Sequence, residues 1–189
     1  MVSILGSQSV LVVSQDDKAR IPLNLATANK QVPILIRLEY RMELLDYDWV
    51  VAEKHKLIPS VYAILNIENG KYKNAKTVTY SGSTFIRICS EKHDTSMAYS
   101  YGKDFDTLMI KKQLYNYTKT TDRQFKPIIV LLTDDSPNKN LYDKKTIQVM
   151  IDHFIKYDFD TIITVYFTPH QSASNPVERR MAPLSHNLA

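Results

Sequence analysis

Pro127-Ile-Ile-Val-Leu-Leu132 is a continuous apolar run that ends at Thr133-Asp134, and it is the centre of the pattern that decides the fold. The next segment, Lys144 to Lys156, has the apolar spacing of a helix. A second apolar run, Thr161 to Phe167, follows it. Strand, helix and strand in this order predict two parallel strands in a sheet that helices cover. We expect the inward face of the helix to consist of Ile147, Val149, Met150, Ile151 and Phe154.

Before this unit, the chain is rich in short strand patterns. The expected strands are Val10–Val13, Ile21–Leu25, Pro33–Leu38 and Val61–Ile67. Two further runs, Thr77–Tyr80 and Thr84–Cys89, are expected to form a hairpin around Ser81-Gly-Ser83. Between these strands and the βαβ unit, the residues from Asp104 to about Tyr117 have helical spacing. Its apolar face is expected to hold Phe105, Leu108, Met109 and Leu114.

The complete order predicts a single α/β domain over residues 1–189, with a mixed sheet and helices on both faces. Three leading strands, a helix, a strand, a helix, a strand and a closing helix are similar to the ribonuclease-H-like arrangement. The stretch from about Asp46 to Ser96 is longer than that arrangement needs. We therefore expect it to be partly an insertion or an elaborated, strand-rich hairpin.

The bulk properties exclude several classes of protein. The chain has 189 residues, of which 44% are hydrophobic, and a formal net charge of +4, which is compatible with a polyanionic partner. One cysteine, Cys89, cannot form an internal disulfide, and four glycines do not form a phosphate-binding loop. No apolar segment is long enough to span a membrane, and Met1 to Ser7 do not resemble a signal peptide. We expect a nuclear or cytoplasmic protein that is not secreted.

Acidic residues stand where three of the expected elements meet loops. Asp16 and Asp17 follow the first strand, Asp134 follows the central apolar run, and Glu178 lies at the start of the last expected helix. In open α/β sheets, ligand-binding groups gather where strands end. Converging carboxylates repel one another unless a cation holds them, and Mg²⁺ and Mn²⁺ prefer such oxygen ligands. These acids are therefore candidate ligands of a divalent metal.

Each acid also has an ordinary structural interpretation. Asp134-Asp-Ser-Pro137 is an acceptable turn sequence without any chemistry. At the last helix, Asn175 can be the N-cap, Pro176 the first helical residue and Glu178 the third. This arrangement is a capping box, in which Glu178 serves the helix and not a metal.

Five longer motifs are distinctive: Ser14-Gln-Asp-Asp-Lys-Ala-Arg-Ile-Pro22, Ala28-Asn-Lys-Gln31, His55-Lys-Leu-Ile-Pro-Ser-Val-Tyr62, Tyr80-Ser-Gly82 and Ser174-Asn-Pro-Val-Glu-Arg-Arg-Met-Ala-Pro-Leu-Ser185. Together they resemble a family of animal proteins derived from mobile elements. The resemblance extends from Ser14 to Ser185, and the first and last motifs are its most specific parts. The family resembles the ribonuclease-H-like DDE transposase domains, which implies nicking and strand transfer of DNA with two Mg²⁺ or Mn²⁺ ions.

The resemblance also implies roles for individual residues. The metal-binding acids are Asp16 or Asp17, then Asp134 and Glu178, with Asp16 favoured because it comes sooner after the strand. The resemblance implies contacts with DNA phosphates for Lys18, Arg179 and Arg180, although a solvated helix face explains the two arginines equally well.

The sequence also departs from the family pattern. Where the family has Gly-Gly-Pro-Asp after the second acid, this chain has Asp135-Ser-Pro-Asn138. We also expect the chain to be truncated at both ends relative to a full transposase. Two alternatives therefore stand beside an active nuclease or transposase core. One is a decayed, catalytically inactive copy that retains the fold and binds DNA, and the other is a protein-interaction module without nucleic acid.

Overall fold

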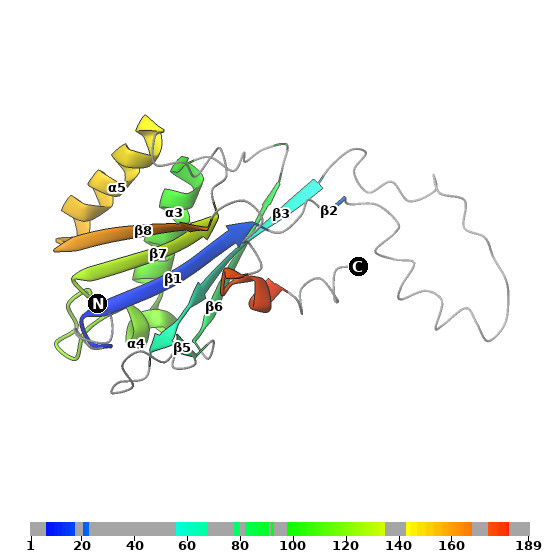
Figure 1. The fold of residues 1–189 in the computed structure, drawn as a ribbon. Coiled ribbons are helices and arrows are strands. Elements are labelled where there is room, and N and C mark those ends of the chain that lie inside the picture. Colours follow the sequence, from blue (N-terminus) through cyan, green and yellow to red (C-terminus); the bar gives the residue numbers. More distant parts are fainter. Residues whose placement is uncertain are drawn as a thin grey trace, which may run out of the picture.

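A computed structural model describes residues 7–17, 21–22, 56–67, 78–79, 82–90, 92, 98–134, 143–167 and 174–181. The strands are β1 (Val10–Asp17), β2 (Ile21–Pro22), β3 (Lys56–Ile64), β4 (Asn66–Ile67), β5 (Val78–Thr79), β6 (Thr84–Ser90), β7 (Ile128–Asp134) and β8 (Thr161–Phe167) (Figure 1). The helices are α3 (Ala98–Ile110), the 3₁₀ helix η3 (Lys112–Leu114), α4 (Tyr115–Thr118) and α5 (Lys144–Tyr157). A last helical turn covers residues 178–181.

Six strands form one mixed sheet. β3 lies between β6 on one side and β1 with β2 on the other, and all three of these neighbours are antiparallel to it. On the far side of β1 the sheet continues through β7 to β8, and both of these pairings are parallel. Parallel neighbours need a long crossover, and α5 provides it between β7 and β8. The α/β class and the predicted βαβ unit are therefore confirmed.

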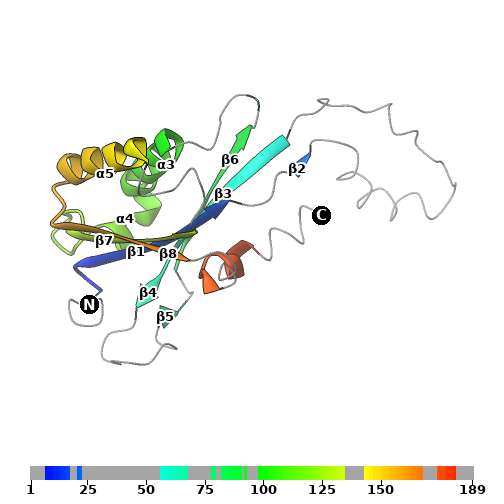
Figure 2. The ribbon, with the colours of Figure 1, turned by 45° about the horizontal axis from the view of Figure 1, so that its top comes forward.

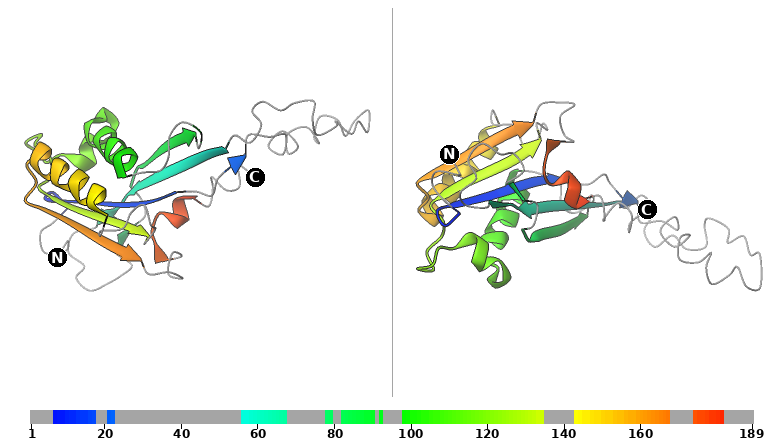
Figure 3. Two further views of the ribbon diagram at one scale, coloured as in Figure 1. Left: turned by 90° about the horizontal axis from the view of Figure 1, so that it is seen from above. Right: turned by 60° about the horizontal axis from the view of Figure 1, so that its bottom comes forward.

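The two faces of the sheet are covered differently (Figures 2 and 3). Alternate side chains point to opposite faces of a strand. Leu11 and Val13 pack in one cluster with Phe105 and Leu108 of α3, which with α5 covers the helix face. Val10 and Val12 belong to a second cluster on the opposite face. The turn 178–181 lies against that opposite face, which we name the acidic face for the residues described below.

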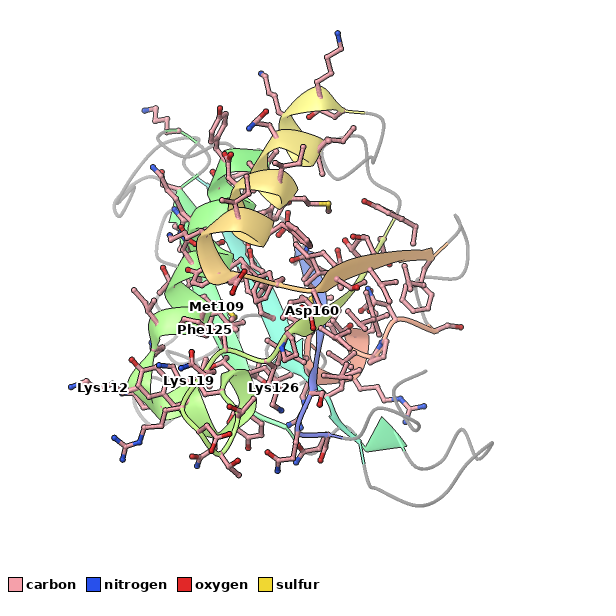
Figure 4. The ribbon with its side chains drawn as sticks, turned by 90° about the vertical axis from the view of Figure 1, so that its left-hand side faces the viewer. Met109, Lys112, Lys119, Phe125, Lys126 and Asp160 are labelled. Carbon is pink, nitrogen blue, oxygen red and sulfur yellow. The ribbon has the colours of Figure 1, made fainter. Side chains whose placement is uncertain are left out.

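The start of β7 is tied to the start of β1 by a buried lysine, at the end of the molecule seen in Figure 4. The Lys126 ammonium group donates to the backbone oxygens of Ser7, at 2.7 Å, and Val10, at 3.5 Å. Burial lowers the pKa of Lys126. The two carbonyl partners compensate part of the desolvation of this group and hold the two parallel strands in register.

The expected hairpin between Thr77–Tyr80 and Thr84–Cys89 is wrong. β6 pairs along its whole length with β3, and β5 pairs with β4. The stretch around Gly82 is instead a close crossing, because a Cβ atom on Gly82 would stand 1.8 Å from the Ile64 carbonyl oxygen. The Ile64 amide donates to the Ser83 oxygen at 3.0 Å in the same place. Glycine at position 82 thus lets the backbone approach β3.

The stretch from Asp46 to Ser96, which was expected to be partly an insertion or an elaborated hairpin, contains the antiparallel pair β3–β6 with the short strands β4 and β5 between them. Its described parts supply β3 and β6, which are full members of the main sheet. The expected strand Pro33–Leu38 lies outside the described residues. β1 is longer than expected and includes both Asp16 and Asp17.

The first long helix differs from the prediction in where it begins, and the second differs in which of its side chains are buried. α3 begins at Ala98, earlier than expected, and its predicted apolar residues Phe105, Leu108 and Met109 are buried. α5 has nearly the predicted bounds. Its predicted inward face is wrong for Ile147, Ile151 and Phe154, which are exposed on the outer side of the helix.

Candidate metal centre

Three carboxylates meet at the carboxyl ends of the parallel strands β1 and β7. The cluster consists of Asp16 from β1, Asp134 from β7 and Glu178 from the turn 178–181, and one oxygen of each lies within 4.8 Å of the other two. Within the described ranges, no other three or more histidine, cysteine, aspartate or glutamate side chains form such a group. All three residues are half-buried. We refer to Asp16, Asp134 and Glu178 as the acidic cluster.

Strand register explains why the first two acids meet. In the parallel pair β1–β7, Ser14 lies opposite Leu132 and Gln15 opposite Thr133, so the next level brings Asp16 beside Asp134. Strand alternation places Asp16 on the same face as Ser14 and Val12. One oxygen of the Asp16 carboxylate accepts a hydrogen bond from the Asp17 amide at 2.8 Å, which restrains its orientation.

Glu178 reaches the cluster through a buried polar network. Asn175, which is 1% exposed, donates from its amide nitrogen to Asp134 Oδ1 at 3.0 Å. Its amide oxygen accepts a hydrogen bond from the Ser14 hydroxyl, which is also fully buried. The same hydroxyl accepts from the Val177 amide at 3.0 Å. Ser14 and Asn175 thus bind β1, β7 and the start of the last turn together, one residue before Glu178.

Apolar contacts and an arginine complete the docking of this turn. Val177 and Met181 are buried against Val61 and Ala63 of β3. The Arg180 guanidinium donates to the Gly82 carbonyl at 3.0 Å. The last turn is therefore attached to β1, β3 and β7, which gives Glu178 a defined place although the helix is short.

The predicted capping role of Asn175 is not the one observed. In a capping box the side chain at this position accepts hydrogen bonds from amides of its own helix. Here the Asn175 side chain bonds to Ser14 and Asp134, and the Ser14 hydroxyl receives the Val177 amide instead. Ser14 of β1 therefore accepts the hydrogen bond from the start of the turn that the Asn175 side chain was expected to accept. Sequence reasoning quoted Ser14 in a motif but assigned it no function.

Asp17 lies on the helix face, away from the acidic cluster. Its carboxylate accepts a hydrogen bond from the Tyr101 hydroxyl of α3. Tyr101 also lines a cavity of about 60 Å³ behind the acidic cluster, between the sheet and helices α3 and α5. Because successive side chains of a strand point to opposite faces, the two neighbouring aspartates are separated by the sheet itself.

Of the three basic residues expected to contact DNA, the structure describes two. Lys18 lies outside the described residues. Arg179 is exposed next to Glu178, whereas Arg180 is half-buried and bound to Gly82.

The donor set fits a hard divalent cation. Three carboxylates supply only oxygen atoms, which Mg²⁺ and Mn²⁺ prefer, and they come from three separate elements whose positions the fold determines. Asn175 donates to one oxygen of Asp134 and so orients this carboxylate, as supporting groups do around known metal ligands. The arrangement can concentrate negative charge at one point of the surface and hold a cation there.

Comparison with known proteins identifies no relative. The chain has no significant match to a protein-family model, to a curated protein or to a solved structure. In the described parts of the chain, no helix has the length and apolar character that crossing a membrane requires.

Proposed function

We propose that this chain is the metal-dependent core of a DDE-type transposase or nuclease, derived from a mobile element, on a ribonuclease-H-like fold. The sheet order supports the fold proposal. Strands β6, β3 and β1 are antiparallel neighbours, β1, β7 and β8 are parallel, and helices follow β6 and β7. The motifs from Ser14 to Ser185 support the proposed origin.

The observation that carries the functional proposal is the acidic cluster. Three acids separated by up to 162 positions in the chain have carboxylate oxygens within 4.8 Å of one another. Such a cluster costs electrostatic free energy unless the acids are protonated or a cation neutralises them. A buried amide, Asn175, is directed at one of the acids and orients it.

Asp16, Asp134 and Glu178 are the residues that would hold Mg²⁺ or Mn²⁺. A bound pair of such ions supplies Lewis acidity toward a phosphate ester and lowers the pKa of a bound water. The protein's own contribution is position: Asn175, held by Ser14, orients the Asp134 carboxylate, and the Ser14 hydroxyl fixes the backbone at Val177, next to Glu178. We propose DNA as the substrate and the exposed Arg179, next to Glu178 in the chain, as a contact to its phosphates.

The test compares two neighbouring aspartates. Asp16→Asn removes a member of the cluster, whereas Asp17→Asn makes the same chemical change on the helix face, where asparagine can still accept from Tyr101. We would titrate each protein with Mn²⁺ by calorimetry and measure nicking of supercoiled plasmid DNA. We expect Asp16→Asn, Asp134→Asn and Glu178→Gln to weaken Mn²⁺ binding at least tenfold and abolish nicking, and Asp17→Asn to do neither.

Each outcome separates the competing functions. Mn²⁺ binding that depends on the cluster, with DNA binding but without nicking, would establish the inactive copy. Mn²⁺ affinity and nicking that are equal in Asp16→Asn and Asp17→Asn would overturn the proposal. Absence of both metal and DNA binding at low salt would favour the protein-interaction module.

A further inference from the structure

Helix α5 carries large apolar side chains on its outward face as well as on its inward face. The residues that turn toward α3 and the sheet are Thr146, Val149, Met150, His153 and Tyr157. The opposite side carries four large apolar side chains, which we name the α5 stripe: Ile147, Ile151, Phe154 and Ile155. Their relative exposures are 42%, 46%, 42% and 72%.

An ordinary surface helix keeps its large apolar residues on the side that faces the core, whereas α5 has a second apolar set on its exposed side. Single exposed apolar residues are common, but four that share one helix face form a contiguous patch, and such patches mark interaction sites. α5 lies at the outer side of the helix layer, beyond α3 as seen from the middle of the sheet (Figures 1 and 3). Its outward face is thus available to another molecule.

The stripe is symmetric about Ile151. Ile147 and Ile155 lie four positions to either side of it, on the same face of the helix. Lys144 and Asp158 lie seven positions to either side, near the same face, and both are exposed. One end of the stripe is therefore basic and the other acidic, with isoleucines at matched places between them.

We propose that the α5 stripe is a self-association surface, on which a second copy of this chain packs its own α5 antiparallel about a two-fold axis at Ile151. An isologous interface needs a self-complementary surface. In this register Ile151 meets Ile151, Ile147 meets Ile155, and Lys144 meets Asp158 of the other copy. Antiparallel packing also places the positive end of each helix dipole beside the negative end of the other.

The size of the stripe determines how strong this association is. From Lys144 to Asp158 a helix extends about 21 Å, and one helix face buries less than the roughly 800 Å² per partner of a standard stable interface. The dimer is therefore weak, with a dissociation constant in the micromolar range or above. The surface is separate from the acidic cluster, and the inference does not rest on the proposed function.

The first experiment is sedimentation equilibrium on the full chain over a wide concentration range. We expect a reversible monomer–dimer equilibrium that Ile151→Lys weakens by at least about tenfold, because this change buries two like charges at the axis. Thermal unfolding controls for the fold, since position 151 is exposed and points away from the core. A protein that remains monomeric at all concentrations, or a dimer that Ile151→Lys leaves unchanged, overturns the proposal.

Charge reversal tests the antiparallel register. Lys144→Glu places an acid opposite Asp158 of the other copy and should weaken the dimer, although an acid in the first turn stabilises the helix itself. Adding Asp158→Lys should restore dimerisation, because the pair is then reversed and again complementary. Failure of the double variant to recover, while its unfolding remains cooperative, overturns the register.

Cysteine crosslinking locates the axis. Ile151→Cys should form an intermolecular disulfide under mild oxidation, because a residue on the two-fold axis lies next to its own copy. The natural Cys89 is buried and does not interfere. Lys145→Cys is the matched control, since Lys145 is exposed on the same helix but off the stripe. Equal crosslinking at positions 145 and 151 would contradict the proposed axis.

Discussion

The carboxylates on the two faces of the sheet are arranged differently. On the helix face three acids, spaced apart from one another, accept from hydroxyl groups or pair with cations. Asp104, which is 2% exposed, accepts from the Tyr62 hydroxyl at 2.7 Å and from Arg87 at 2.6 Å. Asp17 accepts from Tyr101, and Asp106 accepts from Tyr157 and pairs with Lys156. On the acidic face, three carboxylates gather around one point instead.

The difference distinguishes acids that hold the fold together from acids that can act on a ligand. A buried carboxylate with full hydrogen bonding stabilises one arrangement of helix and sheet. Tyr62 illustrates this, because burial and the neighbouring Asp104 raise its pKa well above the ordinary value, so the hydroxyl remains a donor. A cluster of acids raises the free energy of the folded state and lowers it again only when a cation binds.

The largest expected effect is on the helix face. Asp104→Ala should destabilise the fold by about 3 kcal/mol, the lower end for breaking a buried ion pair, because Arg87 retains some contact with water. Urea denaturation measures this loss. Mn²⁺ affinity, determined under conditions where the protein remains folded, should be unchanged. A variant that loses metal binding but not stability would contradict the separation of the two faces.

Asn175→Ala tests the acidic face. We expect a loss of stability of about 1–3 kcal/mol from the unsatisfied Ser14 and Asp134 groups. Mn²⁺ affinity should fall by about 10- to 100-fold, as when a supporting residue of a metal site is removed. Thr133→Val is the control, because Thr133 is buried next to Asp134 but points to the helix face. Equal metal affinities for the two variants would show that Asn175 does not position the cluster.

Gly102→Ala tests how tightly α3 and α5 pack against each other on the helix face. A Cβ atom at this position would stand 2.7 Å from Val149 Cγ1, so α3 and α5 must separate slightly. Overpacking costs about 1–3 kcal/mol, and the gain in helix propensity offsets up to about 1 kcal/mol of that. Adding Val149→Ala should recover part of the loss by making room. If thermal unfolding shows Gly102→Ala alone to be stabilising, the contact between the helices is looser than described.

The smallest expected effect is a pH dependence from His153. Burial lowers the pKa of His153, so the folded state binds this proton less tightly than the unfolded state. Its contribution to stability is complete above the ordinary value of 6.5 and decreases as the pH falls from there toward the lowered pKa. His153→Gln should flatten this part of the stability profile, measured by urea denaturation between about pH 7 and pH 5. An unchanged slope would assign the dependence to another group.

Several features could be predicted from the sequence because they depend on local patterns. The apolar runs at β7 and β8 with a helix between them predicted the parallel pair, and three of the acids at predicted element ends are those of the acidic cluster. The hairpin around Gly82 was wrong because local turn signals do not report that β3, far away in the chain, is the partner of β6. Strand pairing is a long-range property.

The choice between Asp16 and Asp17 shows the same limit at a single position. Val10 to Val13 are apolar at every residue, since both faces of the strand are buried, so the pattern does not tell which side faces α3. Only the register with β7 and the contact with Tyr101 assign the two acids to their faces. The α5 stripe has the same origin: its spacing predicted an amphipathic helix, but the direction of its apolar face depends on which side packs against α3.

The sequence by itself thus determined the α/β class, the βαβ unit and the set of acids from which the cluster is drawn. Apolar periodicity and the ends of elements depend only on residues that are near one another in the sequence. Tertiary structure alone decided that Asp16, Asp134 and Glu178 converge, that Ser14 and Asn175 support them, and that the isoleucines of α5 face outward. These facts depend on contacts between residues up to 163 positions apart, such as Ser14 and Val177. Contacts at such separations arise only when the sheet assembles.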